Sequence, residues 1–211
     1  MSGTKIYVVA AALKQSLETF NFVKYNIRNM GEEDEQGGHF HIIDNNNEHS
    51  IKAEIGGGFL ELQALAANPD AQDSFNCNIV IADEMHTYKT AAQYQVLKDA
   101  TAAYTNKLVI GITTAGDDGA GFCAQRLKYA RMVLDGTFED EGLFIFACCA
   151  EQDERGNVDF LDPIQHEKAN PNWNVTVRPS EIMKKAREAE NDPQQRFEFF
   201  TKRLNVFIGN V

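Results

Sequence analysis

The chain has 211 residues, of which 20 are Lys or Arg and 31 are Asp or Glu, so its formal net charge is −11. Apolar residues make up 43% and charged residues 24%, an ordinary globular composition that excludes collagen-like, low-complexity and wholly disordered classes. The length suits one domain of about 150–200 residues, and the acidic balance argues against a protein whose main surface is a nucleic-acid groove.

The sequence predicts no association with a membrane and no disulfide framework. No stretch reaches the roughly 20 consecutive apolar residues that a membrane span needs. We interpret the apolar run at residues 6–13 as a buried strand leading into a helix rather than as a signal peptide. The four cysteines lack C-x-x-C spacing, which is typical of a cytosolic protein with reduced thiols.

Strand and helix signals alternate over the first 150 residues. Residues 5–11 are β-rich, and from Lys14 to Met30 the apolar residues recur at intervals of three and four, which predicts one face of a helix. The residues of that face are Leu17, Phe20, Val23 and Ile27. Two β-rich segments at 39–44 and 50–55 flank an Asn-rich turn, which predicts a hairpin, and a further strand follows a run of glycines.

The following segments are apolar on both faces, as in a buried parallel sheet. We expect strands near 5–11, 78–82, 107–113 and 143–149 to be neighbours, with helices on both faces of an α/β fold. After residue 150 the strand signal fades, and Pro179 and Pro193 mark the starts of two helices. We therefore expect an α/β part at 1–150 and a helical C-terminal segment at 151–211.

Two carboxylates end the apolar strand at 79–82 abruptly. In open α/β sheets ligands bind at the carboxyl ends of strands, where Asp83 could hold Mg²⁺ and Glu84 could polarise an attacking water. Four apolar residues followed by Asp-Glu form the Walker B pattern of P-loop ATPases. The alternative is a strand end with two solvated acids.

Hydroxyl side chains end the next apolar strand. Thr113 and Thr114 could sense a γ-phosphate or bind the attacking water, although they also suit a simple turn with a Thr cap. His86 could contact this strand from behind the carboxylate pair, and the alternative is an ordinary position at a helix N-terminus. The motif His39-x-His41 could bind a transition metal, but no third ligand stands at fixed spacing, so we interpret these residues as part of a surface hairpin.

Four segments in order resemble the large subunit of the tailed-phage terminase. They are ALKQSLETF, IADEMH, ITTAGDD, and the stretch from HEKANPNW to KRLNVF, and the resemblance extends over nearly the whole chain. The resemblance implies that Asp83 is the Mg²⁺ carboxylate and that Glu84 is the catalytic base. It further implies that Thr113, Thr114 and Gly116 form the coupling motif, with His86 behind the two acids.

The sequence departs from that family at one decisive motif. It contains no G-x-x-x-x-G-K-[ST] phosphate loop and no Gly-Lys pair at all. The resemblance therefore implies an incomplete P-loop NTPase sheet of the ASCE type, beginning after the phosphate loop and ending before the family's nuclease domain. We expect this chain alone not to hydrolyse ATP.

The function that the resemblance implies is a fragment of an ATP-driven viral DNA-packaging motor. In the intact protein the cofactors would be ATP and Mg²⁺, with none bound tightly here. The partners would be double-stranded viral DNA, the small terminase subunit and the portal, in an oligomeric ring in the host bacterial cytoplasm. Two alternatives stay open: a fragment of a DExH-type translocase or helicase, whose box DEMH fits literally, and a non-catalytic truncated prophage remnant.

Overall fold

A computed structural model of the chain describes residues 3–67 and 75–207. The chain divides into two compact units, Met1–Thr113 and Thr114–Val211, and the boundary expected near residue 150 falls inside the second. Within the described ranges, no helix combines the length and the apolar character that crossing a membrane requires.

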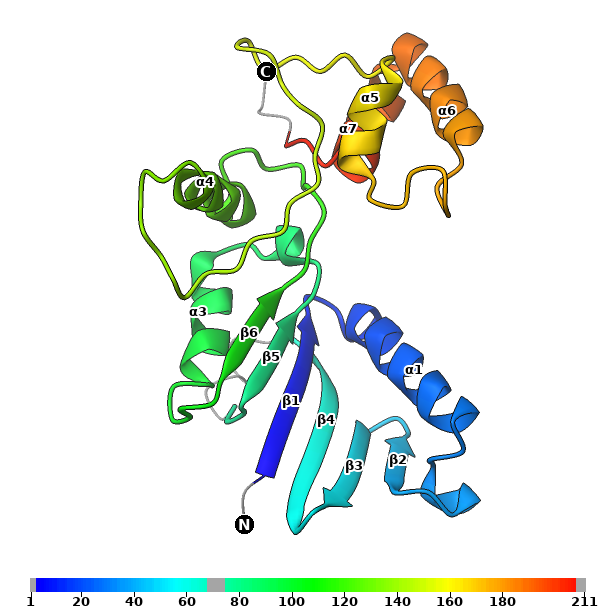
Figure 1. The fold of residues 1–211 in the computed structure, drawn as a ribbon, viewed down its shortest axis with the longest axis vertical. Helices are drawn as coiled ribbons and strands as arrows, with labels where there is room; N and C mark the ends of the chain where they lie inside the picture. Colours follow the sequence, from blue (N-terminus) through cyan, green and yellow to red (C-terminus); the bar gives the residue numbers. More distant parts are fainter. Residues whose placement is uncertain (1–2, 68–74, 208–211) are drawn as a thin grey trace. The chain divides into compact units, whose positions relative to one another are not determined.

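The first unit is built on a six-stranded sheet with the order β2-β3-β4-β1-β5-β6 (Figure 1). β1 pairs in parallel with both β4 and β5, and β5 pairs in parallel with β6, whereas β3 is antiparallel to β2 and to β4. The expectation of a mainly parallel sheet flanked by helices is therefore confirmed. The strand bounds are Gly3–Ala10 (β1), Phe40–Asp44 (β2), His49–Ile55 (β3), Gly58–Ala66 (β4), Ile79–Ala82 (β5) and Leu108–Gly111 (β6).

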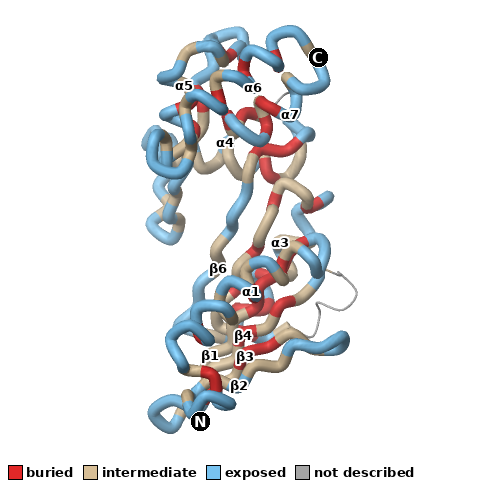
Figure 2. The backbone as a smooth tube through the Cα atoms, turned by 90° about the vertical axis from the view of Figure 1, so that its right-hand side faces the viewer, coloured by how far each residue is buried: buried red, intermediate tan, exposed pale blue. Residues whose placement is uncertain are grey.

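β1 lies in the middle of the sheet and is buried on both faces at its carboxyl end. Val8, Val9 and Ala10 have no exposed surface, as expected for a strand covered from both sides. Figure 2 shows this buried stretch among the neighbouring strands. The carboxyl ends of β1, β5 and β6 therefore point the same way, and the segments that follow these strands leave the same edge of the sheet.

Helix α1 (Leu13–Asn29) packs its predicted apolar face on one side of the sheet. Phe20 and Ile27 are buried against Val8 and Leu62, and Leu17 and Val23 pack at the margin of the same cluster. The helical periodicity in the sequence is therefore confirmed. The shorter helix α3 (Ala91–Asp99) packs on β5.

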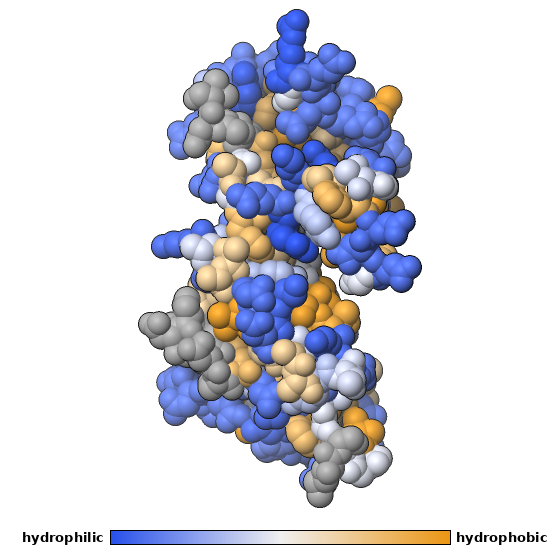
Figure 3. Space-filling view, turned by 90° about the vertical axis from the view of Figure 1, so that its left-hand side faces the viewer, coloured by the Kyte–Doolittle hydropathy of each residue, from blue (hydrophilic) through white to orange (hydrophobic). Residues whose placement is uncertain are grey.

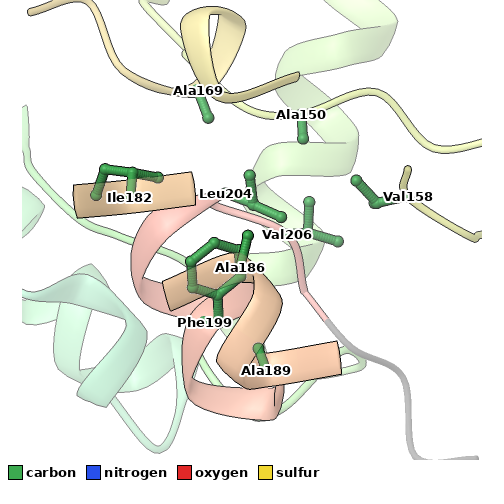
Figure 4. Close-up of a cluster of buried hydrophobic side chains, with 9 residues drawn as sticks. All are labelled: Ala150, Val158, Ala169, Ile182, Ala186, Ala189, Phe199, Leu204 and Val206. Atoms are coloured by element: carbon green, nitrogen blue, oxygen red, sulfur yellow. The ribbon is translucent and has the colours of Figure 1, made fainter. Parts of the chain in front are cut away.

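The second unit is helical around a small core of its own. Its helices are α4 (Phe122–Leu134), α5 (Pro163–Ala169), α6 (Pro179–Asn191) and α7 (Pro193–Arg203). Helices α5, α6 and α7 each begin with proline, which is favoured at the first helical position because it lacks a backbone N–H. Figure 4 shows the core, in which residues of α6 and α7 meet residues from the segments around α5. The buried members are Ala150, Val158, Ala169, Ile182, Ala186, Ala189, Phe199, Leu204 and Val206.

The strand expected at residues 143–149 is absent. This segment runs without secondary structure, and Phe144 and Phe146 are 88% and 75% exposed. A strand exists only when a neighbour takes up its backbone N–H and C=O groups, and β propensity alone cannot supply that partner. The expectation that this segment joins the sheet is therefore wrong for this structure.

β6 is the last strand on its side of the sheet among the described residues. Leu108, its first residue, and Ile112, one residue beyond its end, are 52% and 51% exposed. In the space-filling view apolar residues reach the surface of each unit among hydrophilic ones (Figure 3). The edge of β6 is therefore an apolar, partly open border of the sheet.

Candidate active site

Asp83 and Glu84 lie directly beyond β5, at the carboxyl edge of the parallel strands. The backbone N–H of Asp83 still donates to the Val9 carbonyl of β1, at 2.8 Å. Its side-chain Oδ1 accepts the backbone N–H of Glu84 at 2.9 Å. Asp83 is thus fixed to the central strand, and Glu84 is the first residue to leave the sheet.

The backbone of Glu84 is left-handed, with φ of 51° and ψ of 47°. Such a conformation is uncommon for a residue with a side chain, and it persists only where the surroundings impose it. The short helical turn that follows, Met85–Thr87, supplies the restraint. Both the backbone N–H and the hydroxyl of Thr87 donate to the Glu84 carbonyl, at 2.9 and 2.7 Å.

The same turn is anchored on β6. The N–H of Met85 donates to the Ile112 carbonyl at 3.2 Å. The Met85 side chain packs against Gly111 so closely that a Cβ there would overlap its Sδ. Gly111 is therefore required for this close approach, and the end of β6 holds the turn that aims Glu84.

His86 links the carboxylate of Glu84 to the hydroxyl of Thr113. Its backbone N–H donates to Thr113 Oγ1 at 2.9 Å, and its ring Nδ1 lies 3.3 Å from the same oxygen. Nδ1 also lies 3.0 Å from Glu84 Oε2, which is buried and receives no aligned hydrogen bond. The two atoms are close, but they are not aligned as a hydrogen bond. The three side chains form one connected group within the first unit.

The surroundings of Asp83 include two residues that the sequence did not single out. The Thr19 hydroxyl of α1 donates to Asp83 Oδ2 at a long 3.4 Å. Tyr88 is buried and donates its hydroxyl to the Val9 carbonyl at 3.1 Å. Burial, and secondarily the charge of Asp83, raise the pKa of Tyr88 above its ordinary value, so the phenol is neutral. Thr19 reaches the site from 64 residues away, whereas Tyr88 follows Asp83 in the same segment but bonds to the distant strand β1.

The structure thus brings together four of the predicted site residues: Asp83, Glu84, His86 and Thr113. The other two members of the expected coupling motif, Thr114 and Gly116, follow directly in the chain and belong to the second unit. They are half-buried and buried, respectively. Their part in the site stays a prediction.

The histidines of the hairpin region each contact a carboxylate. His39 lies 3.0 Å from Glu32, His41 lies 2.6 Å from Asp34 and His49 lies 2.7 Å from Asp44. Among the residues that the structure describes, no cluster of three or more His, Cys, Asp or Glu side chains is arranged to hold a metal ion. Each of these histidines is therefore held by a separate carboxylate, and His39 and His41 are exposed while His49 is half-buried.

A shallow cavity of about 460 Å³ lies on the antiparallel part of the sheet. It is lined by Asp34, His39, His41, Lys52, Ala53, Glu54, Phe59, Leu60 and Glu61. Some of its polar groups pair with one another, as Lys52 does with Glu61 at 3.8 Å and His41 with Asp34 at 2.6 Å. It includes none of the residues at the carboxyl edge, so the chemistry suggested by Asp83 and Glu84 does not depend on it.

Comparisons with known proteins agree with this architecture. The sequence profile of a family described as "Terminase large subunit, ATPase domain" matches residues 2–132. Protein YmfN of Escherichia coli (strain K12) is 26% identical over 171 residues, which cover 76% of this chain and 37% of that protein. The crystal structure of the HK97 bacteriophage large terminase has a TM-score of 0.78 and 17% identity, covering 97% of this chain and 40% of that chain.

At 17% identity the likeness to the HK97 protein shows the fold alone. The chain spans about two fifths of the length of each relative, so the activity of a whole relative does not pass directly to these 211 residues.

Proposed function

This chain belongs to the family of terminase large subunit ATPase domains, and we propose that it carries the water-activating site of an ATP-driven motor that packages viral DNA. One observation supports the proposal most. Glu84 leaves the sheet in a strained backbone conformation and is linked through His86 to Thr113 at the end of the neighbouring strand. Strained carboxylates at the carboxyl edge of parallel strands are typical of functional sites.

In this proposal Glu84 is the general base. Its carboxylate would orient a water and accept its proton as the water attacks a γ-phosphate. The left-handed backbone fixes the direction in which the side chain leaves β5, so little reorganisation is needed when the water binds. Thr113 would detect whether the γ-phosphate is present and pass that information to β6.

The residues around Asp83 fit a magnesium ion. Within the described part of the chain, Asp83 Oδ2 has the long contact with the Thr19 hydroxyl, and both groups offer the hard oxygen donors that Mg²⁺ prefers. Magnesium in phosphoryl-transfer sites is commonly held by one or two carboxylates together with substrate phosphates, so a larger protein cluster is not required. When bound, the ion would neutralise charge on the phosphates. Asp83, oriented by the N–H of Glu84, would hold it in place.

The phosphate cradle is not encoded in these residues, because the sequence has no G-x-x-x-x-G-K-[ST]. In the proposed motor a segment outside the 211 residues supplies it. A strand laid in parallel along the open edge of β6 would end beside Thr113, which is where a phosphate must be held to face Glu84. Without that segment the chain should bind ATP weakly and hydrolyse it at background rate.

The proposed partners are those of a packaging motor. They are double-stranded viral DNA, the small terminase subunit, the portal, and further copies in a ring, acting in the host bacterial cytoplasm with ATP and Mg²⁺ as cofactors. A second candidate is a non-catalytic prophage remnant, which the absence of a phosphate loop from the sequence favours.

The test uses the protein with a phosphate-binding segment restored. Glu84→Gln should bind ATP normally but lose hydrolysis by about 10²–10⁴-fold, since it removes a positioned base. Asp83→Asn should weaken binding of the Mg²⁺–nucleotide complex, because a charge facing the cation is lost. Thr114→Val should hydrolyse ATP but move DNA poorly if the coupling motif is assigned correctly.

Three results would contradict parts of the proposal. Unchanged hydrolysis in Glu84→Gln, with complete loss in Asp83→Asn, would show that the base is assigned wrongly. Absence of any hydrolysis in the restored protein would favour the remnant. Robust turnover by the 211-residue chain itself would contradict our account of the missing cradle.

A further inference from the structure

We propose that His86 is a positioning residue that sets the orientation of the Glu84 carboxylate according to the state of Thr113. The inference rests on the proposed function, because it concerns the regulation of the same site. Its basis is the pair of short distances from one ring nitrogen, 3.0 Å from Nδ1 to Glu84 Oε2 and 3.3 Å from Nδ1 to Thr113 Oγ1. One atom thus faces both the proposed base and the neighbouring strand.

Hydrogen-bond accounting indicates which protonation state of the ring fits this arrangement. A neutral imidazole carries either a proton or a lone pair on Nδ1. A lone pair directed at a carboxylate oxygen 3.0 Å away would be repulsive, and Glu84 Oε2 is buried without an aligned donor. An unsatisfied buried oxygen is costly. Nδ1 therefore carries a proton, which Thr113 Oγ1 accepts at 3.3 Å and which lies close to Glu84 Oε2 without being aligned with it.

The backbone makes the ring follow β6. The N–H of His86 is bonded to Thr113 Oγ1, and the N–H of the preceding residue, Met85, is bonded to the Ile112 carbonyl. The imidazole is itself largely enclosed, with 12% of its side-chain surface exposed. A displacement of Thr113 would therefore shift the turn and change how well Nδ1 aligns with Glu84.

The Glu84 carboxylate is partly open to solvent. Glu84 keeps 36% of its side-chain surface exposed, and its Oε2 lies against the His86 ring. When Thr113 engages a phosphate, the Nδ1 proton would turn from Thr113 to Glu84 and fix the carboxylate in one orientation. When Thr113 holds no phosphate, the Nδ1 proton would stay directed at Thr113 Oγ1 and the base would be less well oriented.

The first experiment reads the ring directly and needs no catalysis. Nitrogen-15 NMR of the His86 imidazole in the 211-residue chain should show a protonated Nδ1. Glu84→Ala should move the Nδ1 resonance to the unprotonated position, because the repulsion from the carboxylate is gone and the Thr113 hydroxyl can then donate to the ring. Thr113→Val should leave Nδ1 protonated. His41, which faces Asp34 at the surface, serves as the internal control that none of these changes should affect.

The second experiment separates positioning from folding in the protein with its phosphate-binding segment restored. His86→Ala should lower kcat on the order of 10²-fold with little change in KM, since misplacing a catalytic group by about 1 Å has that effect. His86→Asn, whose amide nitrogen can replace Nδ1–H, should recover much of kcat. The matched control His41→Ala should leave both constants unchanged.

The outcomes separate the role of His86 from the proposed function. An unprotonated Nδ1 that does not respond to Glu84→Ala would overturn the role of His86, whatever the ATPase assays show. Full activity in His86→Ala, together with an inert Glu84→Gln, would also overturn it while leaving the proposed function standing. If the proposed function itself were wrong, Glu84→Gln would still hydrolyse ATP. If His86→Ala does not fold, the nitrogen-15 spectrum of His86 in the unmodified protein and the kcat of His86→Asn test the role of His86.

Discussion

Replacing Glu84 by glycine should make the protein more stable than replacing it by alanine. Both changes remove the same carboxylate and its contact with His86, so they differ only in the backbone. At φ of 51° an L-residue pays about 1–2 kcal/mol of steric strain that glycine avoids. Glycine loses roughly 0.5–1 kcal/mol through its greater freedom in the unfolded chain. We therefore expect Glu84→Gly to be more stable than Glu84→Ala by roughly 0.5–1 kcal/mol.

An alanine in a helix supplies the matched control, because there glycine should lower the stability relative to alanine. Ala92 lies on the exposed side of α3, where Ala92→Gly should cost about 1 kcal/mol. The assay should follow the first unit, and Trp173, the single tryptophan, lies in the second. Hydrogen exchange of β1 and β5 peptides at increasing urea concentration is therefore the suitable measurement.

The size of the effect is within reach of that assay. With a denaturant slope of about 1–3 kcal/mol per molar urea, the two Glu84 variants should differ in midpoint by a few tenths of a molar. A Glu84→Gly protein no more stable than Glu84→Ala would refute the reasoning, because it would mean that the left-handed conformation carries no strain.

Three further predictions concern the first unit and its margins. Phe20→Ala should cost about 3–5 kcal/mol, whereas Phe22→Ala, on the same helix but 75% exposed, should stay within about 0.5 kcal/mol in urea unfolding; similar values would contradict the packing of α1. The Lys24 ammonium holds the pKa of Asp44 below its ordinary value, so this carboxylate stabilises the fold above its unfolded pKa of about 3.9 and stops doing so as the pH falls through the lower folded value. The stability difference between the unmodified protein and Asp44→Asn should accordingly shrink below about pH 4, and a difference that grew there would refute the sign. Burial raises the pKa of the Cys77 thiol to about 11, so mass-spectrometric mapping at pH 8 should find it alkylated far more slowly than the two half-buried cysteines of the second unit, and equal rates would show that it is accessible.

The elements that follow from local chemistry could be predicted from the sequence. The apolar face of α1 repeats every three to four residues, the parallel strands β1, β5 and β6 contain continuous apolar runs, and the hairpin β2–β3 flanks an Asn-rich turn. Helix α7 begins where Asp192 accepts the N–H of Gln194 at 3.0 Å. The dipeptide Asp-Pro predicts this N-cap from the sequence. In each case the signal lies within one element, so no knowledge of distant neighbours is needed.

The candidate site was predictable in part. Asp83, Glu84 and Thr113 stand at strand ends, and parallel strands bring their carboxyl ends to one edge of the sheet. Thr19, by contrast, approaches Asp83 from 64 residues away, and no local pattern marks it.

Two features were decided only by the tertiary structure, because they depend on residues distant in the sequence. Residues 143–149 have the composition of a strand, yet they form none here, because a strand requires hydrogen-bonding neighbours that composition does not specify. The left-handed backbone of Glu84 is imposed by the turn that Ile112 and Thr113 anchor on β6. The sequence by itself determined which residue carries the carboxylate and at which strand end it stands. The packing of that turn on the neighbouring strand determined where the carboxylate points, since only there do the restraints on its backbone come together.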